Sequence, residues 1–248
     1  MIILSILFFI TAILYSSVGF GGGSTYLALL LIWGIPYYIV PIIALLCNII
    51  VVSGNSYNYI RAKNYNFKLL APFLIGSIPF AFYGGTLLIQ KEIFEILLFL
   101  VLSIAGFLLL INNKSYDDKY LTIKKINFFI AIFVGAILGL VSGTVGIGGG
   151  IFLSPILFLL KAEKPRIIAT TASLFILINS IFGILGQLTK ELVFNEIINY
   201  WTLFLFVLIG GLIGNYINLK IFSNRILAII TSFLVIFVAM RIGYKIFI

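Results

Sequence analysis

The sequence predicts an all-α polytopic membrane protein made of two homologous halves, and three observations predict it. Apolar residues make up 62% of the 248 residues and charged residues only 9%, whereas a soluble domain carries about 25% charged residues. Charges divide the chain into long apolar runs, and one glycine-rich motif occurs twice. With a mean hydropathy of +1.25, the chain is expected to be a multi-pass protein of the cell inner (plasma) membrane.

Composition also excludes several classes of function. The chain has no His, a single Cys (Cys47) and only seven acidic residues, so a zinc or iron site lacks ligands and a disulfide within the chain is impossible. Without an imidazole base, Ser-His or Cys-His catalysis is excluded. We therefore expect no enzyme, no catalytic residue, no metal and no cofactor. We attribute the net charge of +9 to the positive-inside rule and not to nucleic-acid binding, because the basic residues lie between apolar runs.

Several uncharged runs have the length of one membrane-spanning helix. A helix needs about 20 residues to cross ~30 Å of hydrocarbon. No ionisable side chain precedes Arg61, and Pro36 divides this first run, which leaves 38–60 as one helix. The later runs predict one helix each, the last of them if it extends from Ser223 to Arg241; they are 69–90, 96–113, 167–189, 197–219 and 226–240.

Two segments, 2–35 and 126–160, are too long for one straight helix. Each contains a glycine cluster near its middle, at 19–23 and at 146–150. Glycine costs about 1 kcal/mol per helix position relative to alanine, so each cluster is predicted to break its helix. Irregular backbone at membrane depth is tolerated only inside protein or beside a watery cavity. Each half therefore opens with a glycine-broken helix or a re-entrant hairpin, followed by three transmembrane helices.

The two clusters belong to an internal repeat. Val-Gly-Phe-Gly-Gly-Gly at 18–23 matches Val-Gly-Ile-Gly-Gly-Gly at 145–150, and Asn48 and Asn179 follow them in similar apolar contexts. We expect one membrane domain with a first repeat at 1–111, a charged linker loop at 112–125 and a second repeat at 126–248. Paired repeats with interrupted apolar segments in corresponding places indicate the binding site of a secondary transporter.

Loop charges bear on how the repeats are oriented. Lys and Arg concentrate in the loops 61–68, 112–125, 161–166 and 220–225, which we place inside, with 90–95 and 190–196 outside. This assignment requires each broken segment to enter and return on one side, which makes the halves inverted repeats. If the broken segments cross fully, the repeats are parallel. The charges favour inversion.

These segments resemble the sulfite exporter TauE/SafE family of membrane permeases, over nearly the whole chain. The resemblance rests on 16–23 with Pro36, on 140–150 with Pro155 and Pro165, on 170–175 through Asn179 and Gly183, and on 76–85. It implies transport, mostly export, of sulfur-containing anions such as sulfite or organosulfonates. The two half-sites are expected to be chemically unequal, because Ser16-Ser17 and Ser24-Thr25 stand where the second copy has Gly143-Thr144 and Ile151-Phe152.

We expect the anion to bind at the midplane between the two breaks and to move by alternating access. A broken helix offers free N–H groups and the positive end of its dipole, and glycine permits close approach of backbone to ligand. Donors are expected from the N–H groups of 21–24 and 148–151, from hydroxyls and from two amides. The candidate substrate-binding residues are Ser16, Ser17, Gly21, Gly22, Gly23, Ser24, Thr25, Asn48, Ser142, Thr144, Gly148, Gly149, Gly150, Thr171, Ser173 and Asn179.

A second interpretation stays open. Glycine clusters also serve close packing of membrane helices, and Ser or Thr hydroxyls often bond back to their own helix. The chain could then be a membrane-embedded accessory or assembly subunit without transport activity. The expected partners are a small sulfur-containing anion and the lipid bilayer, with no nucleic acid. The anion, the direction, the coupling ion and the oligomeric state, a homodimer included, stay open at this point.

Overall fold

The computed structural model describes residues 1–111, 124–190 and 194–218, together with the pairs 232–233, 236–237, 239–240 and 243–244, and these residues contain helices and no strand. The predicted third helix of the second half, 226–240, lies mostly outside the described residues, as does most of the linker. In chain order the helices are α1 (Ile2–Val18), α2 (Gly23–Ile32), α3 (Val40–Arg61), α4 (Phe67–Thr86), α5 (Lys91–Ile111), α6 (Phe128–Val145), α7 (Gly150–Leu159), α8 (Pro165–Gln187), α9 (Phe194–Ile197), a 3-10 turn η2 (Ile198–Tyr200) and α10 (Trp201–Asn218).

Five helices in the described part of the chain are long and apolar enough to cross a membrane. They cover Val40–Arg61, Phe67–Thr86, Phe128–Val145, Arg166–Gln187 and Ile198–Ile217. Side-chain amides cap two of them, since Asn66 Oδ1 accepts from the Leu69 N–H and Asn127 Oδ1 from the Phe129 N–H. The multi-pass helical architecture predicted from the uncharged runs is confirmed.

Both predicted helix breaks are present, and they match residue for residue. α1 ends at Val18 and α2 begins at Gly23, while α6 ends at Val145 and α7 begins at Gly150. The left-handed backbone that separates each pair lies at Gly19 and Gly22 (φ 87° and 85°) and at Gly146 and Gly149 (φ 89° and 74°). L-residues with a Cβ pay about 1–2 kcal/mol for this conformation, which explains why glycine occupies these positions.

Each broken segment is a hairpin, because its second helix turns back toward its first. The ring of Phe8 in α1 stacks on Tyr26 in α2 with centroids 4.7 Å apart, and the Tyr15 hydroxyl lies 2.7 Å from Thr25 Oγ1. The second hairpin repeats a contact of the first. In the first hairpin Gly22 lies against Thr11, and in the second the equivalent Gly149 lies against the Leu138 carbonyl. Because Thr11 and Leu138 are related by the same shift as the glycines, the two hairpins are built alike.

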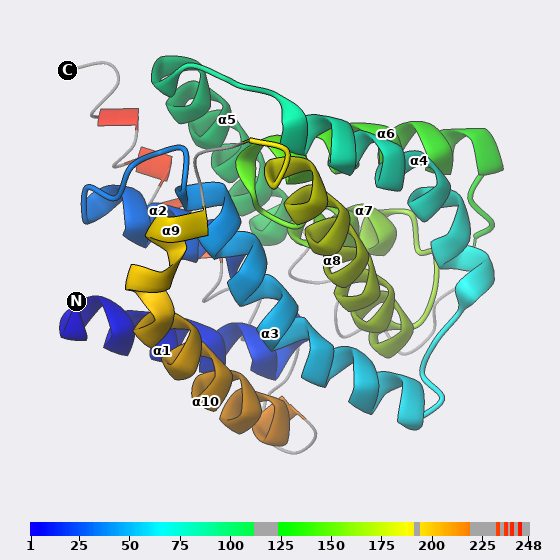
Figure 1. The fold of residues 1–248 in the computed structure, drawn as a ribbon. Helices are drawn as coiled ribbons and strands as arrows, with labels where there is room; N and C mark the ends of the chain where they lie inside the picture. The colour runs from blue at the N-terminus through cyan, green and yellow to red at the C-terminus, as the bar shows by residue number, and fades with distance from the viewer. Residues whose placement is uncertain are drawn as a thin grey trace.

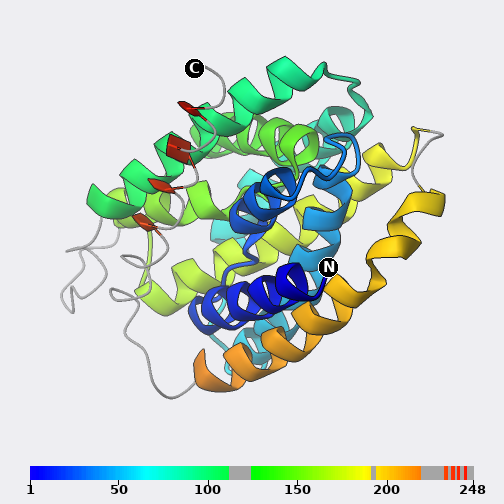
Figure 2. The same cartoon turned by 90° about the vertical axis from the view of Figure 1, so that its left-hand side faces the viewer.

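The two halves interlock through exchanged partners. α1 of the first half packs along α10 of the second, and α6 of the second half packs along α4 of the first (Figures 1 and 2). The α4–α6 contact is very close, because Gly139 and Gly143 place their Cα atoms against the carbonyls of Ser77 and Ala81. Such small-residue packing is typical of membrane helix pairs. α4 also accommodates Pro72 and Pro79 within one helix, which membrane helices tolerate when neighbours satisfy the freed carbonyls.

α3 and α8, the helices that follow the two hairpins, form the central pair. Leu45 contacts Gly183 near one end, and Ser56 Oγ donates to Ser173 Oγ over 3.4 Å near the other. Residue numbers thus rise along α3 as they fall along α8, so the two helices run antiparallel (Figure 1).

Candidate functional site

Asn48 of α3 lies between the two helix breaks. Its Nδ2 donates to the carbonyl oxygen of Ile147, in the second break, over 3.1 Å. Its side chain also fills the space beside three glycines: a Cβ on Gly23 or Gly148 would lie 2.6 or 2.8 Å from Nδ2, and one on Gly21 would overlap Oδ1. Asn48 is fully buried. The structure therefore brings the two breaks together on one amide.

Backbone donors are free at both breaks. The first hydrogen bond of α2 runs from Thr25 N–H to Gly22 O, and that of α7 from Phe152 N–H to Gly149 O. Two positions before these donors, the N–H groups of Gly23 and Gly150 have neither a backbone acceptor nor a side-chain cap within the described residues. Free N–H groups and the positive end of the helix dipole make such a terminus a binding site for anions.

Unpaired side-chain atoms gather at the same place. Asn48 Oδ1, Ser180 Oγ and the Tyr26 hydroxyl are buried without a hydrogen-bond partner in the described structure. Ser180 Oγ would lie 3.2 Å from a Cβ on Gly148, and the Tyr26 ring lies beside Gly22. A buried polar atom without a partner costs about 1–3 kcal/mol, so such atoms indicate a place where water or a ligand binds.

The space at the breaks is small in this conformation. A cavity of about 10 Å³ is lined by Tyr15, Phe20, Gly21, Gly22, Gly23, Ser24, Ile147, Ile151 and Ile176. That volume suits about one water molecule. A larger ligand therefore needs the tips of the two hairpins to move apart.

A larger pocket, of about 250 Å³, lies at the C-terminal ends of α4, α6 and α8; we call it the Lys190 pocket. Besides Lys190, its walls include Thr144, Gln187 and Tyr38. Lys190 Nζ donates to Gln187 Oε1 over 2.9 Å, and Gln187 Nε2 donates to the Gly143 carbonyl over 2.8 Å. Partial burial lowers the pKa of Lys190 to about 8. A positive charge thus lies in the pocket that reaches Thr144, two residues before the second break.

The predicted polar residues of the first hairpin have different partners. Ser24 and Thr25 both contact the hydroxyl of Tyr15, at 3.4 and 2.7 Å. Ser16 donates to the Gly211 carbonyl of α10, and Ser17 donates to the carbonyl of Leu14 in its own helix. Ser24 thus lies at the breaks, whereas Ser16 and Ser17 are engaged elsewhere.

The predicted polar residues of the second half are mostly bonded within their own helices. Thr144 donates to the Leu140 carbonyl, Thr171 to the Ile167 carbonyl and Asn179 Nδ2 to the Phe175 carbonyl. Ser173 pairs with Ser56 of α3, and Ser142 Oγ is buried without a partner in the described structure. None of these bonds reaches a glycine break, so the role of these five residues stays a prediction.

Three residues at or near the site were missing from the prediction. Ser180 follows the predicted Asn179, and the helical turn places it and not Asn179 beside Gly148. Tyr15 lies in an apolar stretch that suggests packing only, yet its hydroxyl contacts both Ser24 and Thr25. Lys190 is the first charge after an apolar run, and nothing in the sequence places its ammonium beside Gln187.

Comparisons with known proteins assign the chain to a family. Residues 4–242 match the family described as Sulfite exporter TauE/SafE. A probable membrane transporter of Sinorhizobium fredii is 27% identical over 232 residues, 93% of each chain. A probable membrane transporter of Methanocaldococcus jannaschii is 31% identical over 198 residues, 76% of this chain and 73% of that one. No solved structure matches the chain. A pair of glycine-broken hairpins meeting on one amide is thus found in a chain whose family match is nearly complete, and the protein belongs to the sulfite exporter TauE/SafE family of membrane transporters.

Proposed function

We propose that this transporter carries a small sulfur-containing anion, such as sulfite or an organosulfonate, and binds it where the two helix breaks meet. One observation supports the proposal most strongly. The N-termini of α2 and α7, one from each half, have free N–H groups and converge on Asn48. An oxyanion has several acceptor oxygens, and two such termini offer donors from two directions.

The donors at the breaks are neutral. Neither 16–25 nor 142–151 contains Lys or Arg, so backbone dipoles must replace the water that the anion loses. Each helix terminus carries the equivalent of about half a positive charge. A site without a full counter-charge binds its anion reversibly, as transport requires.

Asn48 contributes an amide whose two ends differ. Nδ2 is bonded to Ile147, whereas Oδ1 is an acceptor without a donor. An anion that has one O–H group, such as hydrogen sulfite, would satisfy Oδ1 while its other oxygens accept from the backbone. A sulfonate would do so through a water molecule, for which the cavity of about 10 Å³ has room.

We also propose that the two halves are inverted repeats that give alternating access. The support is the antiparallel course of α3 and α8, which follow equivalent hairpins. Equivalent spanning helices that run antiparallel start from opposite faces of the membrane, and the two hairpins then enter from opposite faces too. The closed space at the breaks supports a cycle in which one hairpin tip at a time withdraws, with the Lys190 pocket as the approach from one face.

Flux measurements on reconstituted protein test the proposal. Purified protein in liposomes is compared with Asn48→Leu for uptake of radiolabelled sulfite, isethionate and acetate. Leucine has a similar volume, but it can neither bond the Ile147 carbonyl nor accept from the anion or its bridging water. Asn58→Leu is the matched control, since Asn58 lies on the same helix and donates to Asn215 of α10. A hydrogen bond to a charged group contributes about 1.5–3 kcal/mol, so Asn48→Leu should lower sulfite or isethionate flux at least about ten-fold and Asn58→Leu should not. Wild-type liposomes that carry neither sulfur anion, or equal flux in both variants, would overturn the proposal.

A further inference from the structure

A second and larger pocket lies at the opposite end of α4 and α6 from the Lys190 pocket. It has a volume of about 420 Å³ and lies among the first turns of these two helices, the segment before α6 and the loop between α7 and α8. We call it the basic pocket. Its charged residues are Lys68, Lys124, Lys125 and Glu163, so ammonium groups outnumber the one carboxylate.

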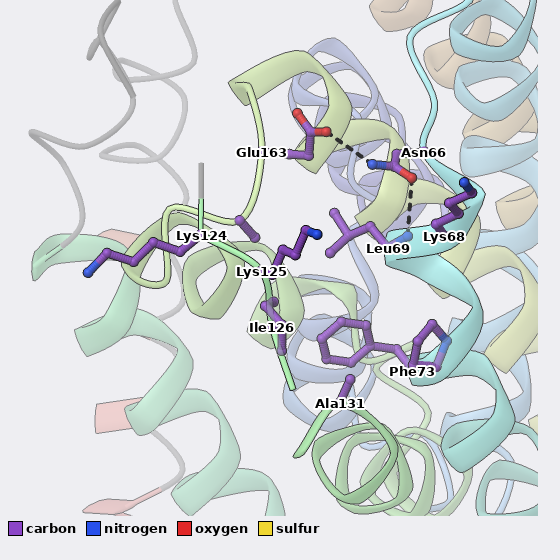
Figure 3. A pocket seen from close by; sticks show the side chains of 11 residues that line it. Asn66, Lys68, Leu69, Phe73, Lys124, Lys125, Ile126, Ala131 and Glu163 are labelled. Carbon is purple, nitrogen blue, oxygen red and sulfur yellow. Dashed lines mark hydrogen bonds between the residues drawn. The ribbon is translucent and has the colours of Figure 1, made fainter. Parts of the chain in front are cut away.

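The charges of the basic pocket are only partly neutralised. Glu163 accepts from Asn66 Nδ2 over 3.0 Å and from the Lys164 N–H. Figure 3 shows Lys125 pointing across the pocket toward Leu69, whereas the ammonium of Lys124 points away from it. No salt bridge involves Lys68 or Lys125 among the residues the structure describes. Both ammonium groups are thus free to bind a negatively charged group.

The rest of the pocket is apolar. Leu69, Pro72, Phe73, Ile126 and Ala131 form its floor. On the face of α6 opposite Ala131, Phe129 and Phe133 are exposed, with 77% and 67% of their surfaces accessible. A ligand that fits the pocket has a negatively charged head and an apolar body.

The pocket also lies at the level of the membrane interface. α4 and α6 both have the length of a membrane span, and the pocket lies at their first turns. The same end of the molecule contains Arg61, Lys63, Lys161, Lys164 and Arg166, the excess of basic residues that is typical of the cytoplasmic face. Anionic phospholipids are concentrated in that leaflet, and basic pockets between membrane helices bind their headgroups.

We propose that the basic pocket binds the phosphate of an anionic phospholipid of the surrounding membrane, through Lys68 and Lys125, with its acyl chains lying against the start of α6. The bound phosphate then contacts both the segment before α6, through Lys125, and the first turn of α4, through Lys68. This site is separate from the helix breaks, and it does not depend on which anion the protein carries.

Thermal stability in detergent tests the proposal without a transport assay. Delipidated wild-type protein is titrated with phosphatidylglycerol or with phosphatidylcholine, and its melting temperature is followed by tryptophan fluorescence. The double variant Lys68→Gln/Lys125→Gln is compared with Lys63→Gln/Lys164→Gln, which removes equal charge from the same end of the molecule outside the pocket. Phosphatidylglycerol should raise the melting temperature of the wild type and of the control pair by at least about 3 °C, and of the pocket variant by less than a third of that.

Two further additions identify the source of the phosphate. Inorganic phosphate and glycerol phosphate should leave the melting temperature unchanged, because they lack the apolar body. Equal stabilisation by these soluble ions would overturn the lipid proposal in favour of a free-anion site. Equal stabilisation by phosphatidylcholine, or an undiminished response of the pocket variant, would overturn it as well.

Discussion

Asn48 donates to the carbonyl oxygen of Ile147, 99 positions later in the chain, and its side chain lies against Gly21 and Gly23, so it contacts both glycine breaks. Asn48 follows the first hairpin, and Ile147 is part of the second. A change in the position of either hairpin tip therefore alters the surroundings of the same amide. In the proposed site, this link joins the contributions of the two halves.

The left-handed glycines should tolerate substitution unequally. Gly149→Ala adds a Cβ at φ 74°, 2.8 Å from the Phe175 ring, whereas Gly34→Ala adds one at φ 73° with nothing within 4 Å. Backbone strain of about 1–2 kcal/mol is common to both variants, and overpacking adds about 1–3 kcal/mol only at Gly149. Melting in detergent should show a loss of a few degrees for Gly34→Ala and about twice as much for Gly149→Ala. Equal losses would contradict the close packing of the second break.

Helix packing gives a second contrast, between two interior helix glycines. A Cβ on Gly139 of α6 would overlap the Ser77 carbonyl of α4, whereas one on Gly211 of α10 would lie 3.6 Å from Val51, an ordinary contact. We expect Gly139→Ala to lower the melting temperature by several degrees, because two backbones must separate. Gly211→Ala should leave it unchanged or raise it slightly, since alanine gains about 0.4–1 kcal/mol over glycine where its conformation fits. The reverse order would show that α4 and α6 do not pack backbone to backbone.

Inversion of the halves predicts a labelling pattern. The single cysteine, Cys47, is buried, so the wild type should not react with a membrane-impermeant maleimide. Arg61→Cys and Lys164→Cys should be labelled from one face of the membrane, and Leu88→Cys, at a site 86% exposed, from the other. Oriented vesicles of both polarities give the measurement. Labelling of positions 61 and 164 from opposite faces would instead support parallel repeats.

The Lys190 pocket predicts a loss of flux at alkaline pH. Partial burial lowers the pKa of Lys190 to about 8, so its ammonium is mostly charged at pH 7 and mostly neutral at pH 9. Among the described residues that line this pocket, the other titratable groups are the hydroxyls of Tyr37 and Tyr38. Tyr38 donates to the Glu196 carboxylate. The pKa of Tyr38 is raised by desolvation and by that carboxylate, which keeps it neutral in this range.

Isethionate is the suitable substrate for this test, because its sulfonate stays ionised throughout. Complete loss of about 1 kcal/mol of attraction lowers flux about five-fold, so with partial charge at both pH values wild-type flux should fall about three- to four-fold between pH 7 and pH 9. Lys190→Gln should be slow at both pH values, while Lys91→Gln, which removes another cation outside the pocket, should keep the wild-type profile. A pH-dependent Lys190→Gln would assign the titration to a different group.

Local chemistry made much of the fold predictable. Segment lengths and the cost of glycine in a helix located both breaks to the residue, and the charge-free runs located α3, α4, α5, α8 and α10 within a few positions. The glycine clusters alone did not indicate that each broken segment folds back; the loop charges favoured it, and contacts such as Phe8 on Tyr26 show it for the first hairpin. A glycine cluster interrupts a helix but does not determine the direction in which the chain continues.

The candidate site was predictable in its backbone and less so in its side chains. Gly21, Gly23 and Gly148 all lie against Asn48, and the internal repeat predicts that the two glycine breaks meet. The partners of hydroxyl groups were harder to predict, because a Ser or Thr in a helix can donate to the carbonyl four residues earlier. Thr144 and Thr171 both form this bond within their own helices. Ser16 instead donates to Gly211, 195 positions away, a partner that only the packing of α1 on α10 can reveal.

The most direct test of the account is to locate the bound anion. Crystals grown with selenite, the heavier analogue of sulfite, allow its selenium to be found by anomalous scattering. We expect one bound selenite whose oxygen atoms lie within hydrogen-bonding distance of the Gly23 and Gly150 N–H groups and of Asn48. A selenium atom found only in the Lys190 pocket or the basic pocket, with the hairpin tips still closed on each other, would contradict it.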